Sequence, residues 1–374
     1  MAKIIVTSEN FCFGSTGMLI SLLSLFKHKH EILFIGTGTA LELAKKEGYQ
    51  SYIDIETSSK KFRKILNKKS SDYDLLISSM DIDSAVFAKK IGMKVVWLDN
   101  IFWYRDSIPP ELASVDYFFC QKGISGDYVS KAKKFRISNF YLVGPLIPKF
   151  RPQKRENKLI VSFGGAEASG FYKFGQETNY PFMMAELIVN YVDLDRFEEV
   201  FFVSNEAVIL ELSKKFSHLD LSKYRFVSLD HDNFINLISS SSLLLTSPGQ
   251  QTILESFFSN TPTITLPAAN DTHYKVNQFL LNSSYKPYVL SWDMFFESQK
   301  FSYSTANHDL NNLWENIKKF GDNLEMKKSV AKRINFLVKN KSFYKKNIEA
   351  QKEIKKEFSI NGLSRVASLI RKIL

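Results

Sequence analysis

A glycine-containing turn that leads into a predicted helix is the most informative motif of the sequence. It reads Ser247-Pro248-Gly249-Gln250-Gln251-Thr252, and Glu255 follows three residues after Thr252. Gly249 lets backbone N–H groups approach an anion closely, and the positive end of the helix that Thr252 opens favours a diphosphate. Glu255 is on the same helix face as Thr252 and can accept hydrogen bonds from ribose hydroxyls. The motif predicts a nucleotide site, and the alternative is a plain helix N-terminus with a buried glutamate.

Polar and glycine residues also follow other predicted strands of the second half of the chain. Gly164 and Gly165 come directly after its first strand, and Asp271, His273 and Asn277 come after a later one. Ligands of open α/β sheets bind outside the carboxyl ends of the strands. We therefore expect a ligand to bind at these strand ends and the three polar side chains to contact sugar hydroxyls or the diphosphate. For His273 the alternative is a loop or capping role.

The loop after the first strand, residues 9–18, contains Gly14, Ser15 and Thr16 and is predicted to contribute to nucleotide binding. It has no histidine that could act as a general base. Three carboxylates at predicted strand ends are the candidates instead: Glu9, Asp81 and Asp99. A carboxylate in a partly dry site can have its pKa raised toward a useful range. For each one the alternative is a capping or turn role.

Asp99 is the first choice among these carboxylates because aromatic residues follow it. Phe102, Trp103 and Tyr104 can stack on a flat acceptor molecule. We therefore predict that these three residues bind the acceptor and that Asp99 accepts its proton.

Three D-x-D triplets bear on metal binding, at residues 81–83, 193–195 and 230–232. Such a triplet can hold a divalent cation on a diphosphate. Asp81 and Asp83 are instead predicted to cap a helix, and the other two triplets occur in turn-like contexts. The sequence has no His/Cys cluster with zinc spacing and no G-x-S-x-G motif. We expect no metal and no cofactor, with the sugar nucleotide acting as a substrate.

The elements that position these residues alternate between strand and helix. Such alternation predicts βαβ units with parallel sheets, here in two successive series joined by a Pro-rich linker at residues 144–157. We expect residues 1–150 to form an acceptor domain, 151–340 a donor domain, and 341–374 a basic helical segment that packs back on the first domain. The predicted strands are 3–7, 31–35, 74–78, 94–98 and 140–143 in the first series, and 158–163, 199–203, 224–227, 243–246 and 263–266 in the second.

The charge of the chain is unevenly distributed. The 374 residues carry a net charge of +11, and residues 326–374 alone carry 14 basic and 3 acidic residues, so residues 1–325 together have no net charge. We therefore expect no nucleic-acid partner. The basic segment can make a weak contact with a membrane surface, and the alternative is a solvated helix face. Two cysteines and no signal peptide or apolar span indicate a cytoplasmic protein.

The order of these features resembles that of GT-B glycosyltransferases, in particular the branch that contains MurG and the UDP-dependent transferases. The resemblance rests on the two Rossmann-like halves, the Gly164-Gly165 turn, the S-P-G-x-x-T-x-x-E motif and the H-x-x-x-N sequence from His273 to Asn277. It implies two domains that face a central cleft, a diphosphate held at Gly249–Thr252, and Glu255 on the ribose. It also implies that Gly164 and Gly165 face the diphosphate or the sugar.

A finer resemblance concerns residues 13–19, residues 97–103 and Ser247-Pro248-Gly249, which are similar to cytosylglucuronate synthases. It implies transfer of glucuronate from UDP-glucuronate to cytosine or hydroxymethylcytosine. The sequence predicts a glycosyltransferase that uses a UDP-sugar and a small acceptor. A sugar-nucleotide hydrolase or epimerase on the same scaffold, or a non-catalytic binding or membrane module, are the alternatives.

Overall fold

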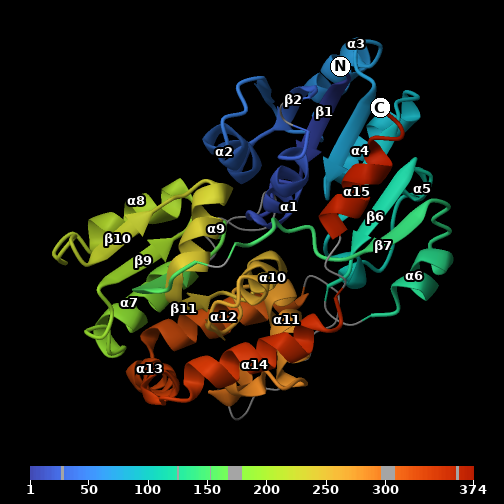
Figure 1. Cartoon of the computed structure of the whole chain (residues 1–374). Coiled ribbons are helices and arrows are strands. Elements are labelled where there is room, and N and C mark those ends of the chain that lie inside the picture. Colours follow the sequence, from blue (N-terminus) through green and yellow to red (C-terminus); the bar gives the residue numbers. More distant parts are fainter. Residues whose placement is uncertain (27–28, 124–125, 152, 167–178, 296–307, 359–361) are drawn as a thin grey trace. The chain divides into compact units, whose positions relative to one another are not determined.

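The computed structural model describes the chain except residues 27–28, 124–125, 152, 167–178, 296–307 and 359–361 (Figure 1). The chain divides into two compact units. The first consists of Met1–Lys149 and Phe358–Leu374, and the second of Phe150–Glu357. The change of unit between Lys149 and Phe150 falls within the Pro-rich segment that was predicted to be the linker.

The first unit is built on a seven-stranded sheet in which every pair of neighbours is parallel. The strand order is β3-β2-β1-β4-β5-β6-β7. Parallel sheets are covered on both faces, which explains the continuous apolar sequences of the central strands. The strands are β1 (Lys3–Ser8), β2 (Glu31–Gly36), β3 (Tyr52–Asp54), β4 (Leu75–Ser79), β5 (Val95–Asp99), β6 (Tyr117–Gln121) and β7 (Phe140–Val143).

Helices cover both faces of this sheet and bury two separate apolar clusters. One cluster joins the sheet to α1, α2 and α15, and the other joins it to α3, α4, α5 and α6. The helices are α1 (Gly14–Leu23), α2 (Gly38–Lys46), α3 (Lys60–Lys69), α4 (Ile82–Lys90), α5 (Pro110–Ala113), α6 (Tyr128–Lys134) and α15 (Gly362–Ile370), and a short 3-10 helix η1 (Phe102–Tyr104) follows β5.

The second unit is also built on a parallel sheet, which has five strands. The strand order is β10-β9-β8-β11-β12, so the first strand of the unit lies in the middle. The strands are β8 (Glu156–Ser162), β9 (Glu199–Val203), β10 (Tyr224–Val227), β11 (Ser241–Thr246) and β12 (Thr263–Thr265).

The helices of the second unit include α11, which begins at Asp271 and contains His273 and Asn277. No helix among the described residues of the chain is long and apolar enough to cross a membrane. The helices are α7 (Tyr180–Tyr191), α8 (Glu206–Lys215), α9 (His231–Ser240), α10 (Gln250–Phe258), α11 (Asp271–Leu281), α12 (His308–Asp322), α13 (Leu324–Lys339) and α14 (Phe343–Lys355).

Each sheet has a topological switch point, where the chain changes the direction in which it adds strands. In the first unit it lies between β1 and β4, because β2 and β3 extend one side and β5 to β7 the other. In the second unit it lies between β8 and β11 for the same reason. Open α/β sheets bind ligands at the carboxyl ends of the strands that flank this point.

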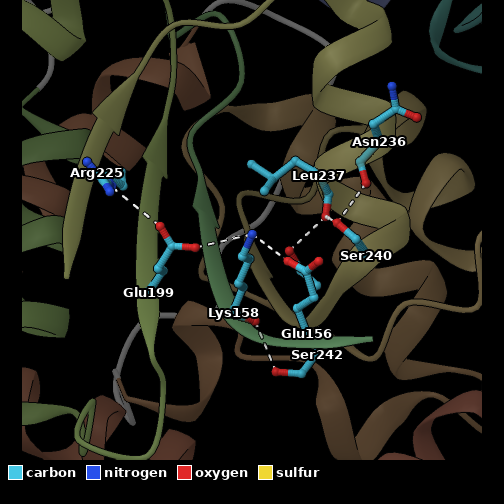
Figure 2. A network of polar contacts seen from close by, with 9 residues as sticks. Glu156, Lys158, Glu199, Arg225, Asn236, Leu237, Ser240 and Ser242 are labelled. Carbon is cyan, nitrogen blue, oxygen red and sulfur yellow. Dashed lines mark hydrogen bonds and ion pairs between the residues drawn. The ribbon is translucent and has the colours of Figure 1, made fainter. Parts of the chain in front are cut away.

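The opposite, amino-terminal edge of the second sheet carries charges that pair with one another (Figure 2). Lys158 Nζ lies 2.5 Å from a carboxylate oxygen of Glu156 and 3.2 Å from one of Glu199, and Arg225 Nε lies 3.4 Å from Glu199. The hydroxyl of Ser242 donates to the carbonyl of Lys158 at 3.0 Å. These groups link β8, β9, β10 and β11 and have a structural role.

The basic segment 341–374 is divided between the two units rather than packing as a whole on the first. Helix α14 belongs to the second unit, where Asn347 bonds the backbone of Thr263 through both its amide oxygen and its amide nitrogen, at 3.0 and 2.7 Å. Helix α15 belongs to the first unit, in which Val366, Ala367 and Ile370 join the apolar cluster around α1.

Candidate functional site

Two loops lie side by side at the switch point of the second unit. One follows β8 and the other follows β11, and the amide of Ser247 donates to the carbonyl of Ser162 at 3.0 Å. The first loop contains Gly164 and Gly165, and the second contains Gly249, so the structure brings together the two glycine motifs predicted to bind the diphosphate.

The Gly164-Gly165 turn has a fixed backbone. Gly164 has a φ of +63°, a conformation that a side chain would strain. The hydroxyl of Ser204 donates to the carbonyl of Gly164 at 2.8 Å, and the side-chain amide of Asn205 donates to the carbonyl of Gly165. With both carbonyls held by buried side chains, the turn keeps one shape.

Helix α10 begins directly after Gly249, in the loop that follows β11, and it has no side-chain cap. Its N-cap residue is Gly249, and its first turn contains no acidic residue. The first amides of a helix have no partner within the helix, and the helix dipole makes this end positive. A phosphate group can therefore bind there through backbone N–H groups, as the sequence predicted for Gly249, Gln250, Gln251 and Thr252.

Glu255 lies one turn into α10 and is 2% exposed. Its Oε1 atom is 2.9 Å from Nε2 of His231 and accepts a hydrogen bond from Nε2 of Gln251 at 3.1 Å. No described residue donates to Oε2 of Glu255. The carboxylate is thus held through one oxygen.

The imidazole of His273 lies next to the beginning of α10, because a Cβ atom placed on Gly249 would be 3.5 Å from Nε2 of His273. Asn270 caps α11 and accepts the amide of His273 at 2.9 Å. Although the residue as a whole is only half-buried, its Nδ1 is enclosed and has no partner among the described residues. Burial lowers the pKa of His273 to about 4, so the ring is neutral at pH 7.

The two other residues predicted to contact the sugar differ from each other. Asp271 is half-buried at the start of α11, and its Oδ1 accepts the amide of Thr272 at 2.9 Å. Asn277 is fully buried, and its Nδ2 donates to the carbonyls of Leu266 and Leu290 at 3.1 and 3.2 Å. Asn277 therefore joins two backbone segments, while its Oδ1 is buried without a partner among the described residues, and its contact with a sugar stays a prediction.

In the first unit, Gly14, Ser15 and Thr16 belong to the first turn of α1 and not to a loop. The hydroxyl of Ser8 bonds those of Ser15 and Thr16 at 3.3 and 2.9 Å, and all three side chains are buried. These hydroxyls fix the junction between β1 and α1. The N-cap residue of α1, Phe13, provides no side-chain cap, so this helix also begins with uncapped amides.

Glu9 and Asp81 follow β1 and β4, the two strands that flank the switch point of the first unit. Burial raises the pKa of Glu9 to about 7, and the nearby charges of Asp81 and other carboxylates contribute. Burial also raises the pKa of Asp81 to about 6. Asp81 caps α4 by accepting the amide of Ser84 at 3.2 Å, as the sequence predicted. Its other carboxylate oxygen is buried without a partner among the described residues.

Asp99 is fully buried, and its carboxylate accepts three hydrogen bonds. Nε of Arg105 and Nε1 of Trp97 donate to Oδ2 at 2.5 and 3.2 Å, and the amide of Ile101 donates to Oδ1 at 3.1 Å. These three donors hold the buried carboxylate in a structural network. The geometry favours Glu9 over Asp99, which was the first choice from the sequence.

The three aromatic residues after Asp99 have different surroundings. Phe102 is fully buried against Phe118, Phe135 and Phe140, so the prediction that it stacks on an acceptor is wrong. Trp103 and Tyr104 are half-buried and contact each other edge to face, with ring centroids 5.9 Å apart. They remain the aromatic candidates for acceptor binding.

The sequence reasoning missed Ser204, Asn205 and His231. Asn205 and Asp230 are N-caps that accept the amides of Val208 and Asn233 at 2.8 and 2.7 Å. A polar residue just before an apolar stretch is a signal for the start of a helix. This signal could have located the starts of α8 and α9, and with them the ends of the strands that precede these helices. The contacts of Asn205 with Gly165 and of His231 with Glu255 join distant parts of the chain and have no local signal.

The sequence matches no protein-family profile and no curated protein. Solved structures do match. HepE of Anabaena in complex with UDP and glucose has a TM-score of 0.50 and 11% identity, over 100% of both chains. UGT89C1 of Arabidopsis thaliana in complex with quercetin has a TM-score of 0.50 and 10% identity, over 94% of this chain and 99% of that chain. With its two parallel sheets, this likeness establishes the GT-B fold that the sequence predicted.

Proposed function

We propose that this chain is a glycosyltransferase that binds a UDP-sugar on its second unit and transfers the sugar to a small acceptor. The observation that carries the proposal is the uncapped start of α10 at Gly249 beside the rigid Gly164-Gly165 turn, at the switch point of the sheet. A diphosphate there can be bound by backbone amides without a lysine. The complexes of HepE with UDP and glucose and of UGT89C1 with quercetin support the two kinds of substrate.

Glu9 is the proposed general base of the reaction. Its carboxylate accepts the proton of an acceptor hydroxyl or N–H group while the acceptor atom forms a bond to the anomeric carbon. The bond from that carbon to the diphosphate oxygen breaks, and its electron pair leaves with UDP. The dipole of α10 stabilises the negative charge on the departing diphosphate. The raised pKa of Glu9, about 7, suits a proton acceptor near neutral pH.

The resemblance to cytosylglucuronate synthases supplies a specific substrate pair, UDP-glucuronate with cytosine or hydroxymethylcytosine. Trp103 and Tyr104 are the aromatic side chains proposed to stack on such a base. We also propose that the reaction needs no metal ion, because backbone amides and the helix dipole already stabilise the diphosphate.

Calorimetric titration of the whole protein with UDP, ADP and GDP tests the donor site. We expect UDP to bind and the Gly164-Gly165 turn to be needed for binding. Incubation with UDP-glucose or UDP-glucuronate, with and without acceptors and with EDTA, then tests the reaction. Acceptor-dependent release of UDP that EDTA does not change supports the transferase. Rapid release without an acceptor would favour a hydrolase, and interconversion of the sugar would favour an epimerase.

A further inference from the structure

The triplet Asp230-His231-Asp232 has a role that its sequence pattern does not suggest. Asp230 caps α9 and is bonded to the amide of Asn233, so its carboxylate serves the helix. The central residue, His231, is the first residue of α9 and is 6% exposed. Helix α9 packs beside α10, and the imidazole of His231 points at α10.

The imidazole contacts Glu255, which we propose to bind the ribose. Nε2 of His231 is 2.9 Å from Oε1 of Glu255, and Nε2 of Gln251 donates to the same oxygen at 3.1 Å. A carboxylate oxygen can only accept, so Nε2 of His231 carries the proton in this contact. Both donors occupy Oε1, and no described residue donates to Oε2.

This arrangement fixes the rotation of a carboxylate that is almost completely enclosed. A buried carboxylate that loses one donor is left undersolvated and turns toward the donors that remain. Because Oε1 already has two partners, Oε2 is the oxygen that a ligand hydroxyl can reach.

We propose that His231 is a positioning residue that, together with Gln251, keeps Oε1 of Glu255 occupied and directs Oε2 to the 2′-hydroxyl of the ribose, so that the site prefers ribonucleotides to 2′-deoxyribonucleotides. The proposal rests on the proposed function, since it needs a nucleotide at α10. It assigns to His231 a role in substrate selection without contact to the substrate.

The test is a titration of the whole protein with UDP and with 2′-deoxy-UDP. The wild type is expected to bind UDP tighter, on the order of tenfold, which is what the loss of one hydrogen bond to a charged group costs. In His231→Ala we expect this ratio to fall toward one. The KM for the UDP-sugar should rise while kcat stays unchanged, because the lost contact is equally present in the ground and transition states.

His218→Ala is the matched control, because His218 is an exposed histidine of the same unit. It should keep the wild-type ratio. If His231→Ala does not fold, His231→Asn serves instead, since asparagine is polar but too short to reach Oε1. A thermal melt of each variant confirms that the folded proteins are compared.

The titrations distinguish a failure of the proposed function from a failure of the positioning role of His231. A wild type that binds neither nucleotide contradicts the proposed function itself. A wild type that prefers UDP, with an unchanged preference in the folded His231 variant, overturns the positioning role and leaves the proposed function standing.

Discussion

The carboxylate of Asp81 lies near enough to Glu9 to help raise the pKa of Glu9 to about 7. The relationship follows from the topology of the first sheet, where β1 and β4 are neighbours and the amide of Glu9 donates to the carbonyl of Ser79 at 2.9 Å. Glu9 and Asp81, which are far apart in the sequence, therefore lie at the carboxyl ends of two neighbouring strands.

The activity of the protein should depend on pH through the ionisation of Glu9. Because Glu9 must be deprotonated to act as a base, kcat/KM should rise as the pH increases through about 7. In Asp81→Asn one negative charge is removed, so the pKa of Glu9 falls and the rise should occur at lower pH. Glu9→Gln should lose on the order of 10²- to 10⁴-fold in kcat, the usual contribution of a general base. Steady-state rates between pH 5 and 9 check this, and an unshifted profile in Asp81→Asn would contradict it.

The same residue should limit stability. A carboxyl whose pKa is raised on folding contributes stability that is fully present below its unfolded value of 4.5 and is lost as the pH rises through about 7. At pH 8 the buried Glu9 is ionised, so Glu9→Gln should be more stable than the wild type by about 1–3 kcal/mol. At pH 4 the difference should disappear. Urea unfolding at both pH values measures it, and Glu325→Gln, at a side chain that is 83% exposed, is a control that should change the stability little.

Gly249→Ala should separate folding from ligand binding. The φ of Gly249 is −68°, which alanine adopts easily, and the added Cβ would be in ordinary contact, 3.5 Å from His273. The melting temperature should therefore change little. A methyl group at the helix start obstructs the approach of a phosphate, so binding of UDP should weaken on the order of tenfold or more. A variant that binds UDP as the wild type does would show that the diphosphate lies elsewhere.

The aromatic residues after Asp99 provide a paired test. Phe102→Ala leaves a cavity among three phenylalanine rings, those of Phe118, Phe135 and Phe140, and should destabilise the protein by about 3–5 kcal/mol. Trp103→Ala should cost less stability and raise the KM of the acceptor. Denaturant unfolding and acceptor kinetics distinguish the two, and an acceptor KM that changes equally in both folded variants would argue against a specific role of Trp103.

The central strands could be predicted because burial on both faces demands uninterrupted apolar sequence. β9 was predicted over its observed residues, 199–203, and β8 and β4 to within one residue at each end, except for the start of β8 at Glu156. β3 was missed because its three residues are largely exposed at the edge of the sheet. β6 (Tyr117–Gln121) was also missed, although four of its five residues are buried between β5 and β7. α3 was missed because only Phe62 and Leu66 are buried in a helix otherwise rich in lysine.

The parts of the candidate site that could be predicted from the sequence are those in which the backbone, rather than a side chain, would bind the ligand. Glycines at strand ends are visible in the sequence, and they do meet at the β8–β11 switch point. Side-chain roles depend on contacts across the fold, which a local pattern does not contain. Asp99 and Phe102 lie at the end of β5 and just after it, as expected. The carboxylate of Asp99, however, is bonded to the guanidinium of Arg105, and the ring of Phe102 packs on the ring of Phe118.

The first unit is discontinuous, and this constrains how the protein is made. A Cβ atom at Gly362 would lie 2.1 Å from the carbonyl oxygen of Gly144, so α15 fits against the end of the first unit with no room for a side chain. During translation the residues of the second unit emerge as one uninterrupted stretch. The earlier-synthesised unit keeps its apolar surface around α1 uncovered until residues 358–374 have left the ribosome. The later part of the chain can therefore finish folding first, and chaperones would have their longest access to the surface around α1.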